Sequence, residues 1–292
     1  MTPDIGRVGI WVGLLDFQPH PTVLDAARHI ESLGFSSMWI PEAVGRDPFV
    51  LASTILGATE RLTVATGIAN IYARDAMAMV SAQQALCEIF PNRFLLGLGV
   101  SHAPMVEGMR GHNYDKPLAF MRDCLAAMAK ALYVAPRTEA PAVVIGALAD
   151  GMLRLSASAA NGSHPYFVPV EHTAHAREVM GPDALLLPEQ MVVFETDPGK
   201  ARAIARGAMG IYLTLPNYTN NLRRFGFDDS DLADGGSDRL VDAIVAWGSE
   251  DQIVARINAH LDAGADHVAV QVVRADREVP RAEWAALASA LL

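Results

Sequence analysis

The sequence is poor in cysteine and short of positive charge. It contains 2 cysteines among 292 residues, and 23 lysines and arginines stand against 33 acids, so the formal net charge is -10. Both cysteines, Cys87 and Cys124, fall inside predicted helices, where buried and reduced thiols of a cytoplasmic protein are expected. Because an acidic chain binds polyanions poorly, nucleic acid and anionic membrane surfaces are not expected partners.

Long hydrophobic runs are also lacking. The N-terminal run that ends near Phe17 is too short to span a bilayer, and it has no basic leader followed by a cleavage site. No other apolar run is long enough to cross a membrane. We therefore expect a cytoplasmic protein without a membrane segment.

The sequence does have a large apolar fraction in a regular alternation. Hydrophobic residues make up 51% of the chain. Short apolar runs rich in β-branched residues alternate with helical patterns, which is typical of an α/β protein with a parallel sheet covered by helices. The predicted strands are Val8–Leu14, Ser37–Ile40, Leu62–Thr66, Arg93–Leu98, Ala142–Ile145, His164–Val168, Met191–Phe194 and His267–Val273. Eight such strands predict a (β/α)8 TIM barrel, and residues 1–292 are expected to form a single domain.

Two insertions interrupt the alternation. Gly99–Lys116 is a long loop after the fourth strand, and the polar Pro216–Ser237 follows the seventh. Long insertions on a compact barrel are usually lids, binding loops or contact surfaces. The predicted helices are Thr22–Leu33, Pro48–Ala58, Asp75–Glu88, Pro117–Leu132, Gly151–Ala160, Glu171–Met180, Pro198–Leu213, Asp238–Trp247 and Ser249–Ala263.

The segment Val64–Arg74 breaks its own pattern where the third strand should end. Its first residues favour a strand, and Gly67-Ile68-Ala69-Asn70 then brings a permissive glycine and an amide side chain before the next helix. In α/β barrels the chemistry lies at this end of the strands. The segment therefore predicts a functional site at the mouth of the barrel.

Two ionisable side chains follow predicted strands at the same end. His102 lies three residues after Gly99, where an imidazole can transfer protons near neutral pH. Glu42 follows the second strand, where a carboxylate can bond a ring N–H or a hydroxyl. An ordinary loop histidine and an exposed loop acid are the alternatives that position alone leaves open.

Two glycine-containing turns are candidate ligand sites. Gly97-Leu98-Gly99 lacks the third glycine of a dinucleotide-binding fingerprint, so it either lets a flat ligand approach the backbone or only permits a tight exit from the strand. Gly146–Met152 leads into a helix whose first N–H groups can hold a phosphate. Asp150 opposes that use because its charge repels an anion, and its structural alternative is a helix N-cap.

The nine histidines do not form a metal-binding pattern, and no metal is expected. The first strand ends in Gly13–Asp16, without the His-x-His pair of barrel metal hydrolases. His172 and His175 are three apart on a predicted helix, and without a third ligand they favour a solvated helix face. Asp266 and His267, at the start of the last strand, are expected to be structural.

Seven motifs carry a family resemblance that runs from about Val8 to Val273. They are WIPEAVGRDPF (Trp39–Phe49), VATGIANIYARD (Val64–Asp75), RFLLGLGVSHAPMVEGMRGHNYDKPLAFMRDCL (Arg93–Leu125), ANGSHPYFVPVEHTAHARE (Ala160–Glu178), LPNYTNNLRRFGF (Leu215–Phe227), DRLVDAIVAWG (Asp238–Gly248) and DAGADHVAVQV (Asp262–Val272). Together they resemble the bacterial luciferase-like superfamily of flavin and deazaflavin barrels, and more closely its actinobacterial oxidoreductases that use coenzyme F420.

The resemblance implies a tricyclic cofactor ring across the mouth of the barrel and a non-prolyl cis peptide bond between Gly67 and Ile68 behind that ring. His102 falls where a sugar-phosphate-oxidising relative carries an acidic catalytic group, so His102 and Glu42 are the implied catalytic residues. The resemblance also implies a homodimer formed by outer helices. The implied cofactor contacts are Glu42, Gly67, Ile68, Asn70, Gly99, Val100 and Met105 around the ring, and Ala147, Leu148, Ala149, Gly151 and Met152 at the phosphate.

Two departures from the family pattern bear on activity. Ala43 stands where the sugar-phosphate enzyme has its catalytic histidine, and His102 replaces an acid, which argues against glucose 6-phosphate as the substrate. Ala149-Asp150-Gly151 replaces a Gly-Pro-Lys turn that is usual in close relatives. One cation is lost and one anion gained, so weaker phosphate binding is expected.

The leading hypothesis is an F420-dependent oxidoreductase that transfers a hydride between the coenzyme and a small organic substrate, with His102 as proton donor or acceptor. An FMN-dependent monooxygenase of the same superfamily and a cofactor-poor, non-catalytic relative are the alternatives. A metal hydrolase is disfavoured because the first strand lacks ligands.

Overall fold

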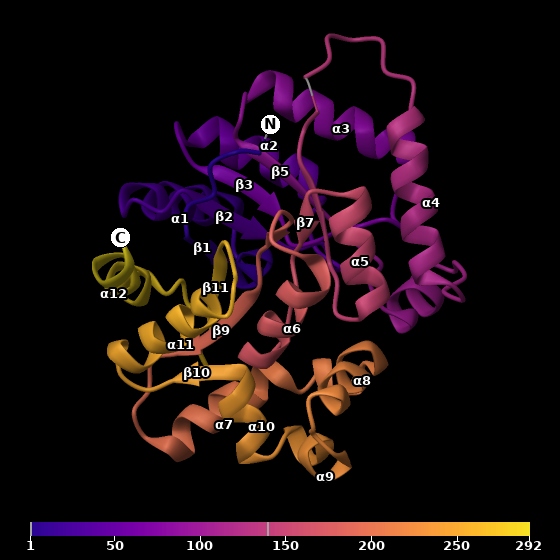
Figure 1. Cartoon of the computed structure of the whole chain (residues 1–292). Coiled ribbons are helices and arrows are strands. Elements are labelled where there is room, and N and C mark those ends of the chain that lie inside the picture. The colour runs from indigo at the N-terminus through magenta and orange to yellow at the C-terminus, as the bar shows by residue number, and fades with distance from the viewer. Residues whose placement is uncertain (1, 139) are drawn as a thin grey trace.

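Parallel strands alternate with covering helices along most of the chain (Figure 1). The computed structural model describes residues 2–138 and 140–292. The strands are β1 (Val8–Trp11), β2 (Ser37–Ile40), β3 (Thr63–Thr66), β4 (Ala69–Asn70), β5 (Phe94–Gly99), β6 (Val143–Ile145), β7 (Gly162–Ser163), β8 (Leu185–Leu186), β9 (Glu189–Val193), β10 (Val245–Trp247) and β11 (Val268–Val272).

Most helices cover the outside of the sheet, as predicted from the alternation. The helices of the described residues are α1 (His20–Ser32), α2 (Pro48–Ala58), α3 (Ala76–Ile89), α4 (Pro117–Lys130), α5 (Asp150–Ala159), α6 (Val170–Met180), α7 (Pro198–Met209), α8 (Pro216–Arg224), α9 (Asp229–Leu232), α10 (Asp238–Ile244), α11 (Glu250–Asp262) and α12 (Arg281–Leu291). None of the helices in the described ranges is both long and apolar enough to cross a membrane.

The sheet closes on itself through the seventh barrel strand. This strand runs over 185–193 and is divided into β8 and β9 around Pro188; β8 pairs with β7, and β9 pairs with β11. The Leu187 N–H donates to the Ser163 carbonyl on one side, and the Ala269 N–H donates to the Pro188 carbonyl on the other, both at 2.9 Å. The predicted eight-stranded parallel barrel is therefore confirmed, and β4 and β10 are additional strands.

Three predicted elements differ from the structure. The first strand ends at Trp11, because Gly13–Phe17 forms a 3-10 turn. His164–Val168 is not a strand: Pro165 has no N–H to donate and Phe167 has a φ of 60°, so the ladder is limited to the two residues of β7. The last residues of the helix expected over 238–247 form β10, which pairs with β9.

Both insertions are more ordered than their composition indicates. The loop after β5 contains a short π-helical turn, Pro104–Met109, and the insertion after α7 folds into α8 and α9. In Figure 1 the α8–α9 region lies beside α10 at one end of the molecule. A further helix, α12, follows the last strand and was not predicted.

The interior of the barrel is centred on Trp39, which is fully buried. Its ring stacks on the His164 imidazole at 4.3 Å between centroids, and its Nε1 donates to His267 Nε2 at 3.0 Å. His267 Nδ1 in turn donates to the Gly6 carbonyl. Burial lowers the pKa of His267 to about 4, so the neutral ring that this bonding needs is present at pH 7. The predicted structural role of His267 is thereby confirmed.

Candidate functional site at the mouth of the barrel

The carboxyl ends of β2, β3 and β5 bring the expected site residues to one rim. Their loops carry Glu42, Gly67–Asn70 and His102. The peptide bond between Gly67 and Ile68 is cis, as the resemblance implies. The backbone N–H of Glu42 donates to the Ile68 carbonyl at 3.2 Å, which joins the β2 and β3 loops.

Glu42 is buried and fully bonded rather than exposed. Its side chain is only 7% exposed and forms an ion pair with Arg74. One carboxylate oxygen accepts from the Asn70 backbone N–H at 2.7 Å and from Arg74 at 2.8 Å; the other accepts from Arg74 at 2.7 Å. The alternative of an exposed loop acid is therefore wrong. Glu42 holds the segment that follows the cis bond.

Asn70 presents two N–H donors that nothing in the described chain accepts. Its Oδ1 accepts from the Tyr72 backbone N–H at 2.9 Å. Its Nδ2 is buried and has no hydrogen-bond partner among the described residues. A buried donor without a partner costs free energy, so this atom points to a missing acceptor.

Gly67 is needed because polar side chains lie directly against it. A Cβ at this position would be 2.7 Å from Trp11 Nε1 and 2.8 Å from His164 Nε2, so any side chain would clash. Both nitrogens are buried and lack hydrogen-bond partners among the described residues. His164 Nδ1 lies 2.7 Å from the Leu187 carbonyl, so this nitrogen carries the proton and Nε2 is an acceptor.

The glycines of the Gly97–Gly99 turn are explained by contacts within the chain. A Cβ on Gly97 would lie 1.9 Å from the Thr66 carbonyl oxygen, and one on Gly99 would lie 2.3 Å from Ile68 Cδ1. The Ile68 side chain thus occupies the space that Gly99 leaves open. Val100, next in sequence, packs against the main hydrophobic cluster.

A pocket of about 500 Å³ opens on this rim, a size in the range of small-ligand sites. It brings Glu42 together with Met105, whose sulfur accepts from the Ser101 hydroxyl at 3.3 Å. Its lining comes from three loops: Glu42, Ala43, Val44, Gly45, Arg46, Asp47, Ala73, Arg74, Met105, Met109 and Arg110.

His102 lies under the insertion that follows α7. Its Nδ1 is 3.0 Å from Asn217 Oδ1, and its ring lies 5.2 Å from that of Tyr218, both on α8. Burial lowers the pKa of His102, and the bond to Asn217 acts in the opposite direction. The ring is therefore neutral at pH 7 and able to accept a proton.

Three tyrosines from separate segments form a cluster that reaches His102 through Tyr218. The hydroxyl of Tyr166 lies 2.7 Å from that of Tyr212 and donates to Gln271 Oε1 at 2.9 Å. Tyr218 lies 5.4 Å from Tyr212 and 6.2 Å from Tyr166 between ring centroids. Burial raises the pKa of Tyr212 to about 12, so its hydroxyl stays protonated.

The expected phosphate turn leads into α5, but Asp150 is not its N-cap. Ala149 is the N-cap residue, and it makes no side-chain cap bond. Asp150 lies in the first turn, where one oxygen is 2.8 Å from His175 Nε2 and the other 3.2 Å from Arg154. The bond to His175 holds the pKa of Asp150 below its usual range. The carboxylate of Asp150 thus lies at the helix start where a phosphate was expected.

The remaining residues of this turn make contacts within the chain. Ala147 is buried in a small cluster that Met152 borders, and the Leu148 carbonyl accepts from His172 Nε2 at 2.9 Å. A Cβ on Gly151 would meet only Leu118 Cδ2, at 2.9 Å.

The solvated helix face expected for His172 and His175 is wrong for His172. His172 is fully buried, and burial lowers its pKa to about 4, whereas His175 is partly exposed beside Asp150. Within the described residues, no three His, Cys, Asp or Glu side chains are arranged to hold a metal ion.

Glu189 is a buried acid that the sequence did not single out. It lies on β9 and is 1% exposed; one oxygen accepts from the Phe167 N–H at 3.4 Å, and Oε1 has no partner among the described residues. Burial raises its pKa to about 8, so the carboxyl is largely protonated at pH 7.

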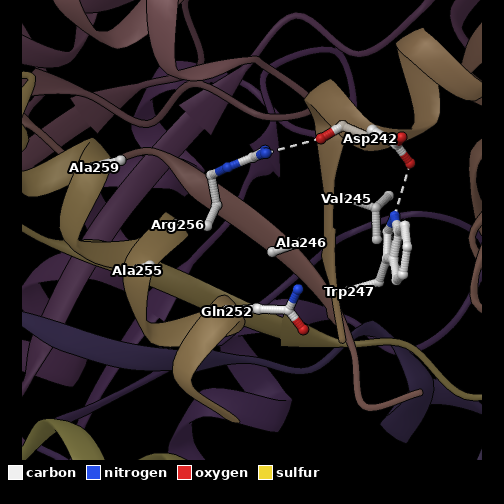
Figure 2. A pocket seen from close by; sticks show the side chains of 8 residues that line it. All are labelled: Asp242, Val245, Ala246, Trp247, Gln252, Ala255, Arg256 and Ala259. Carbon is white, nitrogen blue, oxygen red and sulfur yellow. Dashed lines mark hydrogen bonds between the residues drawn. The ribbon is translucent and has the colours of Figure 1, made fainter. Parts of the chain in front are cut away.

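A second cavity, of about 410 Å³, lies away from the mouth between β10 and α11. Figure 2 shows Arg256 and Trp247 both bonded to Asp242 there, with Gln252 below them. None of the site residues expected from the sequence lines it.

Sequence reasoning missed Arg74, Asn217 and the tyrosines. Arg74 closes the VATGIANIYAR motif, where an arginine after a polar strand end could have indicated a partner for Glu42. Asn217 belongs to an amide-rich run, Asn217–Asn221, whose composition indicates only a polar insertion.

Comparisons with known proteins agree with this architecture. A model of the luciferase-like monooxygenase family matches residues 13–267. The 5,10-methylenetetrahydromethanopterin reductase of Methanolobus tindarius is 25% identical over an alignment of 305 positions, which covers 87% of this chain and 92% of the reductase.

Two solved structures share the fold. The coenzyme F420 dependent tetrahydromethanopterin reductase of Methanopyrus kandleri superposes with a TM-score of 0.77 at 15% identity, over 97% of this chain and 98% of the reductase. The oxygenating constituent of 3,6-diketocamphane monooxygenase of Pseudomonas putida, solved with FMN, gives a TM-score of 0.72 at 15% identity, over 97% of each chain. Because the family model spans most of the sequence, the chain belongs to the luciferase-like monooxygenase family.

Proposed function

We propose that this protein is an F420-dependent oxidoreductase acting on a small organic molecule at the mouth of the barrel. The observation that carries the proposal is the buried Nδ2 of Asn70, which has no hydrogen-bond partner among the described residues. The carbonyl groups of a deazaflavin or flavin ring are acceptors of the kind that this donor lacks. The pocket beside Glu42 and Met105 supplies space on the same rim.

The bound deazaflavin supplies hydride chemistry, and the chain supplies position and proton handling. Asn70 donates to the ring, and Ile68 forms the surface behind it. Glu42 acts indirectly, because Arg74 and the Asn70 N–H already occupy both of its oxygens. His102, neutral at pH 7, accepts or returns a proton at Nε2. The turn Ala147–Met152 faces the phosphate, against the charge of Asp150.

Equilibrium titration of the cofactor-free protein with F420 and with FMN, followed by ligand fluorescence, tests the proposal. We expect F420 to bind more tightly. Asn70→Ala should weaken F420 binding about 5- to 10-fold, the value of one hydrogen bond of about 1 kcal/mol. Asn220→Ala, an exposed change on α8, is the matched control and should leave the affinity unchanged.

The other outcomes select the alternatives. Tight FMN binding without F420 binding contradicts the proposal and favours the flavin monooxygenase, which the FMN-bound fold relative supports. Oxygen consumption with reduced FMN then identifies that activity. If neither cofactor binds, the chain is a cofactor-poor relative, and Asp150 is the feature that accounts for it.

We further propose that the active form is a homodimer. The outer helices α2 and α3 carry unusually little charge: α2 has no charged residue, and α3 has only Glu88. Exposed apolar side chains, Val50 on α2 and Met77 and Ile89 on α3, support a contact with a second copy.

A further inference from the structure

The insertion after α7 reaches the histidine that the proposed function uses. Asn217 Oδ1 lies 3.0 Å from His102 Nδ1, although 115 positions separate the two residues in the sequence. Tyr218 flanks the same imidazole at 5.2 Å. His102 follows β5, so the contact exists only when α8 is docked on the mouth.

The bond selects one tautomer of the imidazole. An amide oxygen carries no hydrogen, so the bond requires the proton of neutral His102 to be on Nδ1. Nε2 then has a free lone pair and can accept a proton. With the proton on Nε2 instead, Nδ1 and the Asn217 oxygen would be two acceptors facing each other, and the amide would have to turn from the orientation that the structure shows.

We propose that Asn217 is a positioning residue, which holds His102 in the tautomer that leaves Nε2 as the proton acceptor. The insertion helix α8 thereby completes the site, because it brings the Asn217 oxygen to Nδ1 of His102 and so favours this tautomer. The role of His102 in proton transfer rests on the proposed function; the pairing of His102 with Asn217 does not.

The docking of α8 does not depend on Asn217. Tyr218 and Leu222 are buried on this helix, and Tyr218 packs edge-on against Phe167 at 5.4 Å between centroids. The Asn217 residue itself is exposed. Removal of its side chain is therefore expected to change the imidazole without releasing the helix.

Long-range ¹H–¹⁵N NMR spectra of the cofactor-free protein report the tautomer and the pKa of His102 directly. The signals are assigned by their loss in His102→Gln. We expect the Nδ1–H form in the wild type and a shift toward the Nε2–H form in Asn217→Ala. Asn217→Asp places an anion on Nδ1–H and should raise the pKa of His102 by about one unit. Asn220→Ala and Asn220→Asp, on the same helix, should change neither quantity.

Two results overturn the proposal: a wild-type His102 in the Nε2–H form, or an Asn217→Ala spectrum identical to that of the wild type. F420 titrations of the same variants keep the two proposals apart. If wild-type protein fails to bind F420 while the tautomer depends on Asn217, the proposed function fails and the positioning role stands. If F420 binds and the tautomer is independent of Asn217, the reverse holds.

Discussion

At the scale of a residue, a buried ion pair between Glu42 and Arg74 supports the rim of the barrel. The side chain of Glu42 is 7% exposed and that of Arg74 is 14% exposed, and the two form a two-pronged ion pair. Glu42→Gln leaves the Arg74 charge buried without its main partner. We expect a loss of about 3 kcal/mol in the free energy of unfolding, measured by urea denaturation.

Glu60→Gln is the matched control for that change. Glu60 pairs with Arg61 at 3.7 Å, but its side chain is 86% exposed. Exposed pairs contribute little, so the unfolding free energy should stay within about 0.5 kcal/mol of the wild type. Equal losses in the two variants would show that the Glu42–Arg74 pair is not a buried support of the rim.

Glu189 predicts a dependence of stability on pH. Its pKa rises from 4.5 in the unfolded chain to about 8 in the folded protein. Between these values the folded state keeps a proton that the unfolded state has lost, so this group lowers stability as the pH rises. Glu189→Gln removes that effect. The free energy of unfolding of the variant should rise relative to that of the wild type by about 1.4 kcal/mol per pH unit from 4.5 to 8.

Urea denaturation at pH 5 and pH 8 checks this expectation. The buried histidines act in the opposite direction and in a more acidic range, because burial lowers the pKa of His164 and His267 to about 4. They are common to both proteins and cancel in the difference. If the difference in unfolding free energy between the variant and the wild type is no larger at pH 8 than at pH 5, a protonated Glu189 is ruled out.

The location of the rim residues could be predicted from their positions after strands in the sequence. Glu42, Asn70 and His102 follow strands, and the carboxyl ends of parallel strands meet at one rim. Arg74, the partner of Glu42, had a weak signal in its place after a polar strand end. Asn217, the partner of His102, was not predictable, because α8 reaches His102 only in the folded protein. Glu189 was hidden for another reason: a buried acid inside an apolar strand has no local sequence signal.

At the scale of elements, β3 and β5 approach so closely that position 97 has room only for glycine. A Cβ on Gly97 would lie 1.9 Å from the Thr66 carbonyl, which is backbone and cannot move aside. Gly97→Ala should therefore cost about 1–3 kcal/mol of stability. Gly207→Ala, in α7 with no atom within 4 Å, should instead stabilise by about 0.5–1 kcal/mol. Thermal denaturation of both variants checks the opposite signs.

Removal of the negative charge of Asp150 at the start of α5 is expected to raise the affinity for the cofactor. Asp150 places a negative charge in the first turn and engages His175 and Arg154. Asp150→Asn removes the charge and frees the Arg154 guanidinium to interact with a bound phosphate. We expect binding of the phosphate-bearing cofactor to tighten about two- to five-fold at low salt, measured by fluorescence titration. The gain should shrink in high salt, because this site is exposed to solvent.

An unchanged affinity at low salt would mean that no phosphate lies at this helix. Arg122→Gln is the control for a general charge effect, since this arginine is exposed on α4 beside Asp123. It should leave the affinity unchanged.

Elements with a continuous apolar run were predicted well, and those defined by pairing or by turns were not. β2 has the predicted bounds, and α2 begins and ends as expected. β10 was missed because three apolar residues at the end of a helical pattern become a strand only by pairing with β9. The sequence of α8 indicates only part of a polar insertion, since the buried face of this helix is short.

At the scale of the whole molecule, the distribution of charge separates one surface from the rest. The chain is acidic, with a net charge of -10, yet α2 lacks charged residues and α3 has one. These two helices are neighbours on the outside of the barrel (Figure 1). A surface with so little charge is poorly suited to solvent and well suited to a second copy of the same helices, because no charge then has to be buried.

The weakly charged surface of α2 and α3 leads us to expect a dimer in solution. Analytical ultracentrifugation should give twice the chain mass of 31.3 kDa. Val50 and Met77 are 66% and 55% exposed near the starts of α2 and α3, and the pair of changes Val50→Arg and Met77→Arg should give the monomer mass. Val134→Arg, at a residue that is 91% exposed in the loop before β6, adds the same charge elsewhere and should leave the dimer intact. A monomeric wild type would refute the homodimer, and a dimer that survives both arginines would place its interface on another face.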